Sequence, residues 1–144
     1  MNKNVKFDYD NGVSSCTIVV DGKTFTAYAR CPPEDNDMKN QNTGFEIAFR
    51  RVSLLIYKAR RDELKARLGA LNQLYYSMKH SSKFNQKSYE NIMLQRQIQL
   101  TSDDLATIKE MIAITKQNLK EYIDKKDEFY KAIRANRAKK ANNN

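Results

Sequence analysis

The sequence contains few of the residues from which catalytic and metal sites are usually built. Its 144 residues include one histidine, two cysteines, two prolines and no tryptophan. A zinc site needs three or four His or Cys ligands, and the three present here are widely spaced. Glycine occurs only as Gly12, Gly22, Gly44 and Gly69, which leaves no glycine-rich phosphate-binding loop. The sequence therefore predicts no metal site and no cofactor.

The single histidine, His80, is followed by Ser81 and Ser82 in a polar stretch. A nucleophile–base pair needs a third group that orients the base, and no such group is apparent. The paired acids Asp62-Glu63 and Asp103-Asp104 fit a salt-bridged helix face and a helix start better than a general acid–base pair. We therefore predict no catalytic residues and no enzyme activity.

No hydrophobic run is long enough to span a bilayer, and the chain starts without a signal peptide pattern. These features predict a cytoplasmic protein that does not bind membranes. The charge, in contrast, is strongly one-sided, with 26 Lys and Arg against 17 Asp and Glu, or +9 in total. An excess of this size indicates an anionic partner, which could be a nucleic acid, a nucleotide, an acidic protein or an anionic lipid. The alternative is that the charge only keeps the protein soluble.

The first thirty residues predict a three-stranded antiparallel meander. Asn11-Gly12 and Asp21-Gly22 are two-residue hairpin turns, because these residues tolerate positive φ. Type I′ turns at both places set Cys16 opposite Phe7 on one side and Ala27 on the other. One sheet face then gathers the apolar residues Val5, Phe7, Tyr9, Cys16, Ile18, Val20, Phe25, Ala27, Ala29 and Cys31. Cys16 and Cys31 lie roughly 13 Å apart in this register, too far for a disulfide.

Two long helices are expected after the meander, in an α+β fold with one domain. A polar loop leads to Thr43, which with Glu46 forms a capping box. Thr101-Ser102-Asp103-Asp104 is a second helix start, with acids at the positive end of the helix dipole. The expected segments are a meander over 1–33, a long helix over 43–79, a connecting segment over 80–101, a long helix over 102–137 and a disordered tail over 138–144.

Both helices are amphipathic. The second has a heptad seam, formed by Leu105, Ile108, Ile112, Thr115, Leu119, Tyr122, Lys126, Phe129 and Ile133. The first has two apolar stripes that a five-residue step separates, with Ile47, Leu54 and Ile56 beside them. Helices of about 50 Å cannot be covered by thirty residues of sheet. We therefore predict a homo-oligomer, a dimer or larger, with a helical core.

The candidate ligand residues combine cations, amides and an aromatic ring. Arg50 lies on the basic first helix, and Arg134 and Arg137 lie one turn apart near the end of the second. Guanidinium groups suit phosphate, aromatic rings stack on bases, and amides read base edges. The middle segment supplies the other candidates, Phe84, Asn85 and Asn91. The alternative for Arg50 is a solvated, salt-bridged helix face. For Arg134 and Arg137 the ordinary explanation is that cations at a helix C-terminus complement the helix dipole.

The layout resembles a known family of phage proteins. The residues that carry the resemblance are Thr26–Asp35, which read TAYARCPPED, and Gly44–Arg50, which read GFEIAFR and open a long helix. In this arrangement the chain resembles the first family of Thoeris anti-defence proteins, which are small phage oligomers with an N-terminal sheet and long helices. As architecture the resemblance spans the chain, and as motif it covers about residues 24 to 50.

The resemblance implies a function that needs no catalytic group. Members of that family bind cyclic ADP-ribose isomers made by bacterial TIR-domain proteins, and hold the signal without cleaving it; some also hold cyclic oligonucleotides. The family's ligand residues have no one-to-one match here. Three alternatives stay open: a phage inhibitor of a defence protein, similar to anti-CRISPR factors, a basic DNA- or RNA-binding dimer, and an enzyme that acts on nucleotides.

Overall fold

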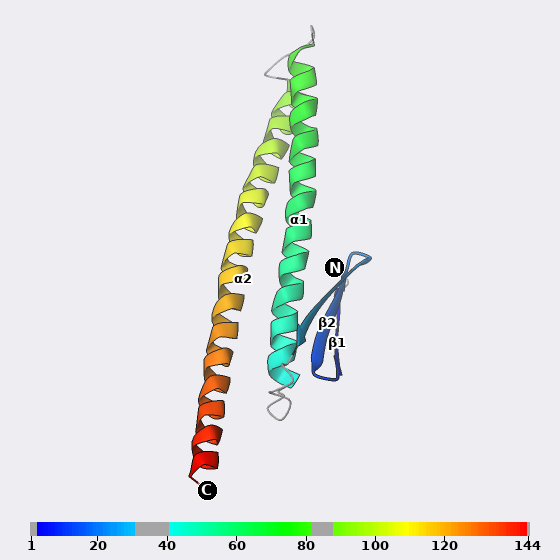
Figure 1. Cartoon of the computed structure of the whole chain (residues 1–144). Coiled ribbons are helices and arrows are strands. Elements are labelled where there is room, and N and C mark those ends of the chain that lie inside the picture. The colour runs from blue at the N-terminus through cyan, green and yellow to red at the C-terminus, as the bar shows by residue number, and fades with distance from the viewer. Residues whose placement is uncertain (1–2, 31–40, 82–87, 144) are drawn as a thin grey trace. The chain divides into compact units, whose positions relative to one another are not determined.

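The computed structural model describes residues 3–30, 41–81 and 88–143. Three strands, β1 (Lys3–Asp10), β2 (Val13–Val20) and β3 (Lys23–Arg30), precede two long helices. The helices are α1 (Gln41–Lys79) and α2 (Tyr89–Asn142), and Figure 1 shows all five elements along the chain. The predicted α+β fold, a three-stranded antiparallel sheet followed by two long helices, is therefore confirmed.

The sheet has the predicted order and register. Its strands run β1-β2-β3, with Cys16 opposite both Phe7 and Ala27. Asn11 and Asp21 have φ of 50°, and the glycines that follow them have φ of 81° and 78°. Two consecutive residues with positive φ are the mark of a type I′ turn, whose twist matches that of the strands it joins. The two hairpin turns thus determine which residues share a face.

The chain forms two compact units. The first, which we call the sheet unit, comprises Met1–Leu55 and Ile114–Asn144; the second, which we call the helix-pair unit, comprises Ile56–Ala113. Each long helix contributes residues to both units. We describe each unit by itself.

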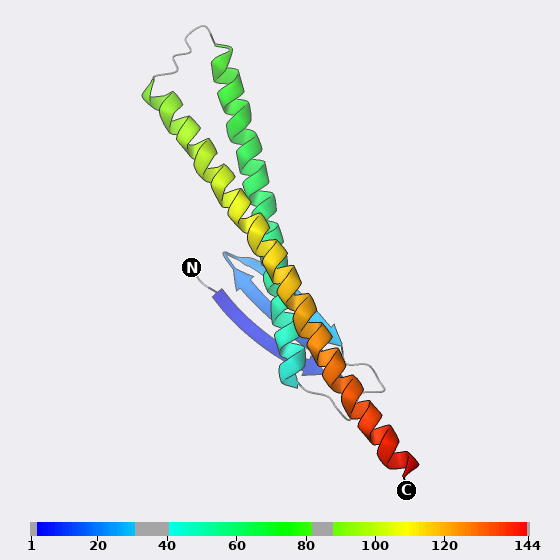
Figure 2. The ribbon, with the colours of Figure 1, turned by 90° about the vertical axis from the view of Figure 1, so that its left-hand side faces the viewer.

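In the sheet unit, the predicted apolar face of the sheet packs against the start of α1. Cys16 and Ile18 are fully buried, as is Val52 on the helix. The rings of Phe7 and Phe45 lie 5.1 Å apart between centroids, and Figures 1 and 2 show the strands beside the N-terminal turns of α1. The apolar residues that alternate along the strands thus pack against the apolar stripe of α1 and form one core.

A hydrogen bond and a close approach complete this sheet–helix contact. Arg51 Nη1 on α1 donates to the backbone carbonyl of Tyr28 on β3 at 2.7 Å. A Cβ added at Gly44 would lie 2.8 Å from Ser14 Cβ and closer still to Ser14 Oγ. The sheet can approach α1 this closely because position 44 has no side chain.

The helix-pair unit has a separate core between α1 and α2. Leu64 packs with Leu105 and Ile108, and Tyr57 and Leu68 cover this cluster. The unit also buries two polar side chains of α2, Asn91 at 1% exposure and Thr101 at 4%. On its surface Arg67 Nη2 donates to Gln97 Oε1 at 3.4 Å, again joining the two helices.

The expected boundaries of the helices need correction. α2 starts at Tyr89, so residues 89–101 are helical and are not a connecting segment, and α2 reaches Asn142, so most of the tail expected to be disordered is helical. The start signal at Thr101 fails because Leu94 and Thr101 are buried, so the core face continues upstream of it. α1 also begins before Thr43, which lies in the first turn and not at the cap.

Within the described residues, neither of the two long helices is both long and apolar enough to cross a bilayer.

Candidate functional site

Cations and aromatic rings gather where α1 and α2 meet in the sheet unit. Arg50 Cζ on α1 lies 4.8 Å from the centroid of the Tyr122 ring on α2. Lys126 Nζ, one turn further along α2, lies 5.7 Å from the same centroid. A cation within about 6 Å of a ring centroid is attracted by the negative face of the ring. Tyr122 therefore interacts with two cations from two helices.

The arrangement continues along α2 to Phe129 and Tyr130. Lys126 Nζ lies 6.0 Å from the centroid of Phe129. The rings of Phe129 and Tyr130 meet edge to face, with centroids 5.6 Å apart. Phe129 is 58% exposed, so part of its side chain can be reached by a ligand. We call Arg50, Tyr122, Lys126, Phe129 and Tyr130 the cation–aromatic cluster.

Helix geometry explains why these α2 side chains lie together. Tyr122, Lys126, Phe129 and Ile133 follow steps of four, three and four residues, so they share one face of the helix. The same steps were predicted from sequence as an apolar seam. Lys126 and Ile133 are half-buried, whereas Phe129 is exposed, so this end of the seam has fewer packing contacts than its start at Leu105.

Glu46 orients the guanidinium of Arg50. Arg50 Nε donates to Glu46 Oε1 at 2.8 Å, across one turn of α1. Among the described residues, the two Nη groups of Arg50 have no hydrogen-bond partner. The carboxylate therefore fixes the plane of the guanidinium, while the fork that can bind phosphate with two parallel bonds remains available.

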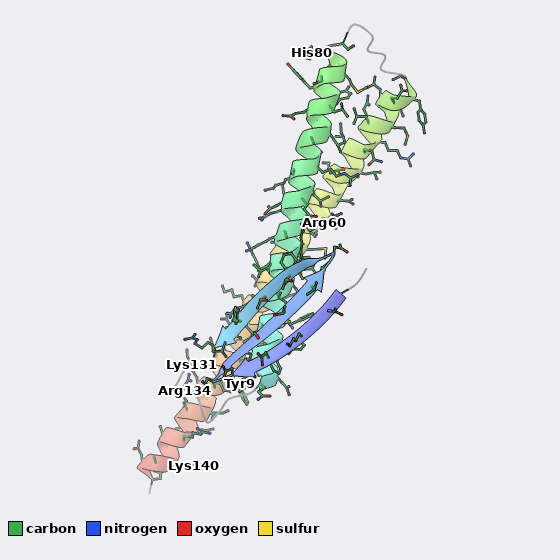
Figure 3. The ribbon with its side chains drawn as sticks, turned by 90° about the vertical axis from the view of Figure 1, so that its right-hand side faces the viewer. Tyr9, Arg60, His80, Lys131, Arg134 and Lys140 are labelled. Carbon is green, nitrogen blue, oxygen red and sulfur yellow. The ribbon has the colours of Figure 1, made fainter. Side chains whose placement is uncertain are left out.

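The last turns of α2 add more positive charge. After Glu128 no acid occurs in the sequence, and Figure 3 labels Lys131, Arg134 and Lys140 along these turns. The cations of this basic end are Lys131, Arg134, Arg137, Lys139 and Lys140. They complement the negative end of the helix dipole and also place a positive potential next to Phe129 and Tyr130.

The structure brings together only part of the candidate set predicted from sequence. Arg50, Arg134 and Arg137 all lie in the sheet unit. Asn91 lies in the helix-pair unit, where it is buried and its backbone N–H donates to Ser88 Oγ at 3.3 Å. The other two candidates, Phe84 and Asn85, lie outside the described residues.

Sequence reasoning missed Tyr122, Lys126, Phe129 and Tyr130 as site residues. Three of them, Tyr122, Lys126 and Phe129, belong to the predicted heptad seam. A lysine between two aromatic residues at steps of four and three is itself a cation–π pattern on a helix. That signal was present, but the contribution of Arg50 depends on how α1 and α2 align and could not be read from either helix alone.

In the part of the chain that the structure describes, no group of three or more His, Cys, Asp or Glu side chains could hold a metal ion. His80 follows the last turn of α1, where its ring meets Tyr76 edge to face at 4.3 Å. The cluster offers charge, hydrogen-bond donors and stacking surface, which are the elements of a binding site.

No protein-family model, curated protein or solved structure matches this chain.

Proposed function

We propose that the protein binds and sequesters a cyclic nucleotide immune signal, of the cyclic ADP-ribose isomer type, without cleaving it. The observation that carries this proposal is the cation–aromatic cluster, in which the exposed Phe129 ring lies beside Lys126, and Lys126 and Arg50 both approach Tyr122. Cyclic oligonucleotides present the same combination of base and phosphate and are further candidate ligands.

Each part of such a ligand has a partner in the cluster. The purine ring stacks on Phe129, an interaction worth about 1–3 kcal/mol per base. The pyrophosphate lies between Lys126 Nζ and the Nη groups of Arg50, which Glu46 holds in orientation. Arg134 and Arg137, further along α2, raise the local concentration of the anion.

Capture without cleavage agrees with the kinds of residues present. Sequestration requires a complementary surface and does not require a general base or a metal ion. The layout of the sheet and the two helices is also the one that resembles the Thoeris anti-defence family. On this proposal the protein is made by a phage and acts in the cytoplasm of the infected bacterium.

A thermal-shift screen with cyclic ADP-ribose isomers tests the proposal. We expect a melting temperature that rises with ligand concentration, because a ligand that binds only the folded state stabilises it. Phe129→Ala should weaken binding at least about tenfold, the loss of one base stack. Its matched control is Tyr76→Ala, which removes another exposed helical aromatic, in the part of α1 assigned to the helix-pair unit.

The charge contribution needs its own control pair. Lys126→Ala should weaken binding, whereas Lys125→Ala removes the same charge from the neighbouring position and should have little effect. Both lysines lie on α2, and only Lys126 approaches Tyr122 and Phe129. Equal losses in the two variants would indicate that only the overall charge of the protein attracts the ligand.

Nucleic acid binding is the second candidate, and the basic end of α2 favours it. Five cations without an acid, next to two aromatic rings, suit single-stranded DNA or RNA. A gel shift that weakens steeply with salt, together with no response to cyclic nucleotides, would favour this function. A protein that binds neither would fit the third alternative, a phage inhibitor of a defence protein.

A further inference from the structure

α2 has a second seam on the side of the helix away from its core face. Within the helix-pair unit, the core face is formed by Leu94, Leu105, Ile108 and Ile112. A second set follows the steps of three and four residues that keep side chains on one face, roughly 115° round the helix from the first at 100° per residue. This outer seam comprises Tyr89, Met93, Arg96, Leu100, Asp104, Thr107 and Met111.

Large apolar side chains of the outer seam are exposed. Tyr89 is 75% exposed, Leu100 49% and Met111 37%. Ile92, beside the seam, is also exposed at 53%. The seam extends about 33 Å along the helix at 1.5 Å per residue. Exposed apolar side chains repeated along one helix face over this length are typical of an interface.

The seam also carries two exposed residues of opposite charge, Arg96 and Asp104. Arg96 and Asp104 make no ion pair or hydrogen bond with any other residue that the structure describes. Within one chain they are eight residues apart, or about 12 Å along the helix, which is too far for a direct pair. Solvated helix faces commonly place opposite charges three or four residues apart instead.

We propose that the outer seam pairs antiparallel with the same seam of a second copy, about a two-fold axis at Leu100. In this register, residues equally distant from position 100 face one another. Arg96 faces Asp104 of the partner subunit, Met93 faces the partner's Thr107, and Tyr89 faces the partner's Met111. A two-fold axis repeats each of these pairs, so two ion pairs flank a central leucine pair.

Charge complementarity favours a second copy of the chain as the partner, and it favours an antiparallel orientation of the two helices. A parallel pairing would place Arg96 against the partner's Arg96 and Asp104 against the partner's Asp104, both repulsive. Only the antiparallel arrangement brings opposite charges together while keeping apolar side chains opposite one another at the centre. Apolar contact supplies the affinity, and the charges set the orientation. Because the seam is self-complementary, a second copy of this chain satisfies it without any other partner.

Reversal of charge tests this pairing by sedimentation velocity. We expect the wild-type protein to be a dimer. Arg96→Asp and Asp104→Arg should each raise the dimer dissociation constant at least about tenfold, since each places like charges together. The double variant restores opposite charges and should return the constant to within about threefold of the wild type. Arg96 and Asp104 do not touch within one chain, so without the proposed pairing the effects of the two substitutions on the dissociation constant would simply add.

A control variant separates the interface from charge alone. Lys109→Asp also reverses the charge of one side chain, at an exposed position outside the seam, and should leave the dimer intact. A wild-type protein that stays monomeric at about 100 μM, well above ordinary interface affinities, would overturn the proposal. So would single variants that dimerise normally, or a double variant no better than the singles. Nucleotide binding is tested in the sheet unit by other residues, so either proposal can fail without the other.

Discussion

Arg50 on α1 and Tyr122 on α2 form a cation–π contact, with 4.8 Å between the guanidinium carbon and the ring centroid. The two residues are far apart in sequence. Their contact joins α1 to α2 in the sheet unit, and both residues belong to the cation–aromatic cluster. Glu46 holds Arg50 from one side, and Lys126 approaches the same ring. The site therefore depends on how the helices pair and also contributes to that pairing.

The contribution of this contact to stability can be measured. Tyr122→Leu keeps apolar volume but removes the ring face, and should lower the free energy of unfolding by about 0.5–1 kcal/mol. Tyr122→Phe keeps the ring and should cost much less. Urea denaturation measures both values. If the phenylalanine variant is as unstable as the leucine variant, the hydroxyl group matters and the cation–π interaction does not.

The close approach of Gly44 to Ser14 predicts a coupled pair of substitutions. Gly44→Ala should destabilise the protein by about 1–2 kcal/mol, because overpacking against Ser14 outweighs the gain in helix propensity. Ser14→Gly removes the opposing Cβ. The double variant should therefore be more stable than the sum of the single effects predicts, by at least about 1 kcal/mol. Strictly additive effects in urea denaturation would show that the sheet does not rest on α1 at this point.

Two other glycines provide a test of backbone conformation alone. A Cβ at Gly22 or at Gly69 would meet nothing within 4 Å, but Gly22 has a φ of +78° in a hairpin turn whereas Gly69 is helical. Gly22→Ala should cost about 1 kcal/mol or more, and Gly69→Ala should stabilise the protein by about 0.5–1 kcal/mol. Thermal or urea unfolding would check the opposite signs. A stabilising Gly22→Ala would contradict the type I′ turn.

Cys16 predicts a specific dependence on pH. Burial raises the pKa of its thiol, so the folded protein keeps the proton at pH values where the unfolded chain has lost it. The free energy of unfolding is then unaffected by this group below about pH 8.5, the ordinary thiol pKa. It falls as the pH rises from there through the raised pKa of the folded state.

The measurement uses a Cys31→Ser background, in which Cys16 is the remaining cysteine. Between about pH 8 and 10, this variant should lose more stability than the same chain with Cys16→Ala. Ellman's reagent should label Cys16 only slowly until denaturant is added, since the thiol is fully buried. Equal pH profiles together with rapid labelling would mean that Cys16 is accessible to solvent.

The sheet could be predicted closely because its information is local. Asn11 and Asp21 each specify a turn, and each turn fixes the register of its two strands. Both turns place the same apolar residues on one face, so two independent signals agree. Where structure depends on neighbouring residues in this way, the sequence alone is sufficient.

The second helix and the site were harder to predict because they depend on distant contacts. A helix cap such as the one predicted at Thr101 stabilises a helix by only about 1 kcal/mol. Buried side chains lie on both sides of Thr101, so α2 continues past that position toward its N-terminus. Likewise, the chemistry of Arg50 makes it a candidate phosphate ligand from sequence, whereas its neighbour Tyr122 follows only from the pairing of α1 with α2. Local patterns do not contain this information.

We propose that the protein holds a cyclic nucleotide and leaves it intact. Equilibrium dialysis of the purified protein against a cyclic ADP-ribose isomer, followed by heat release and mass spectrometry, tests both parts at once. We predict retention of the ligand on the protein side and recovery at its original mass, with retention lost in Phe129→Ala and kept in Tyr76→Ala. Absence of retention, or recovery of a product heavier by one water, would contradict the account.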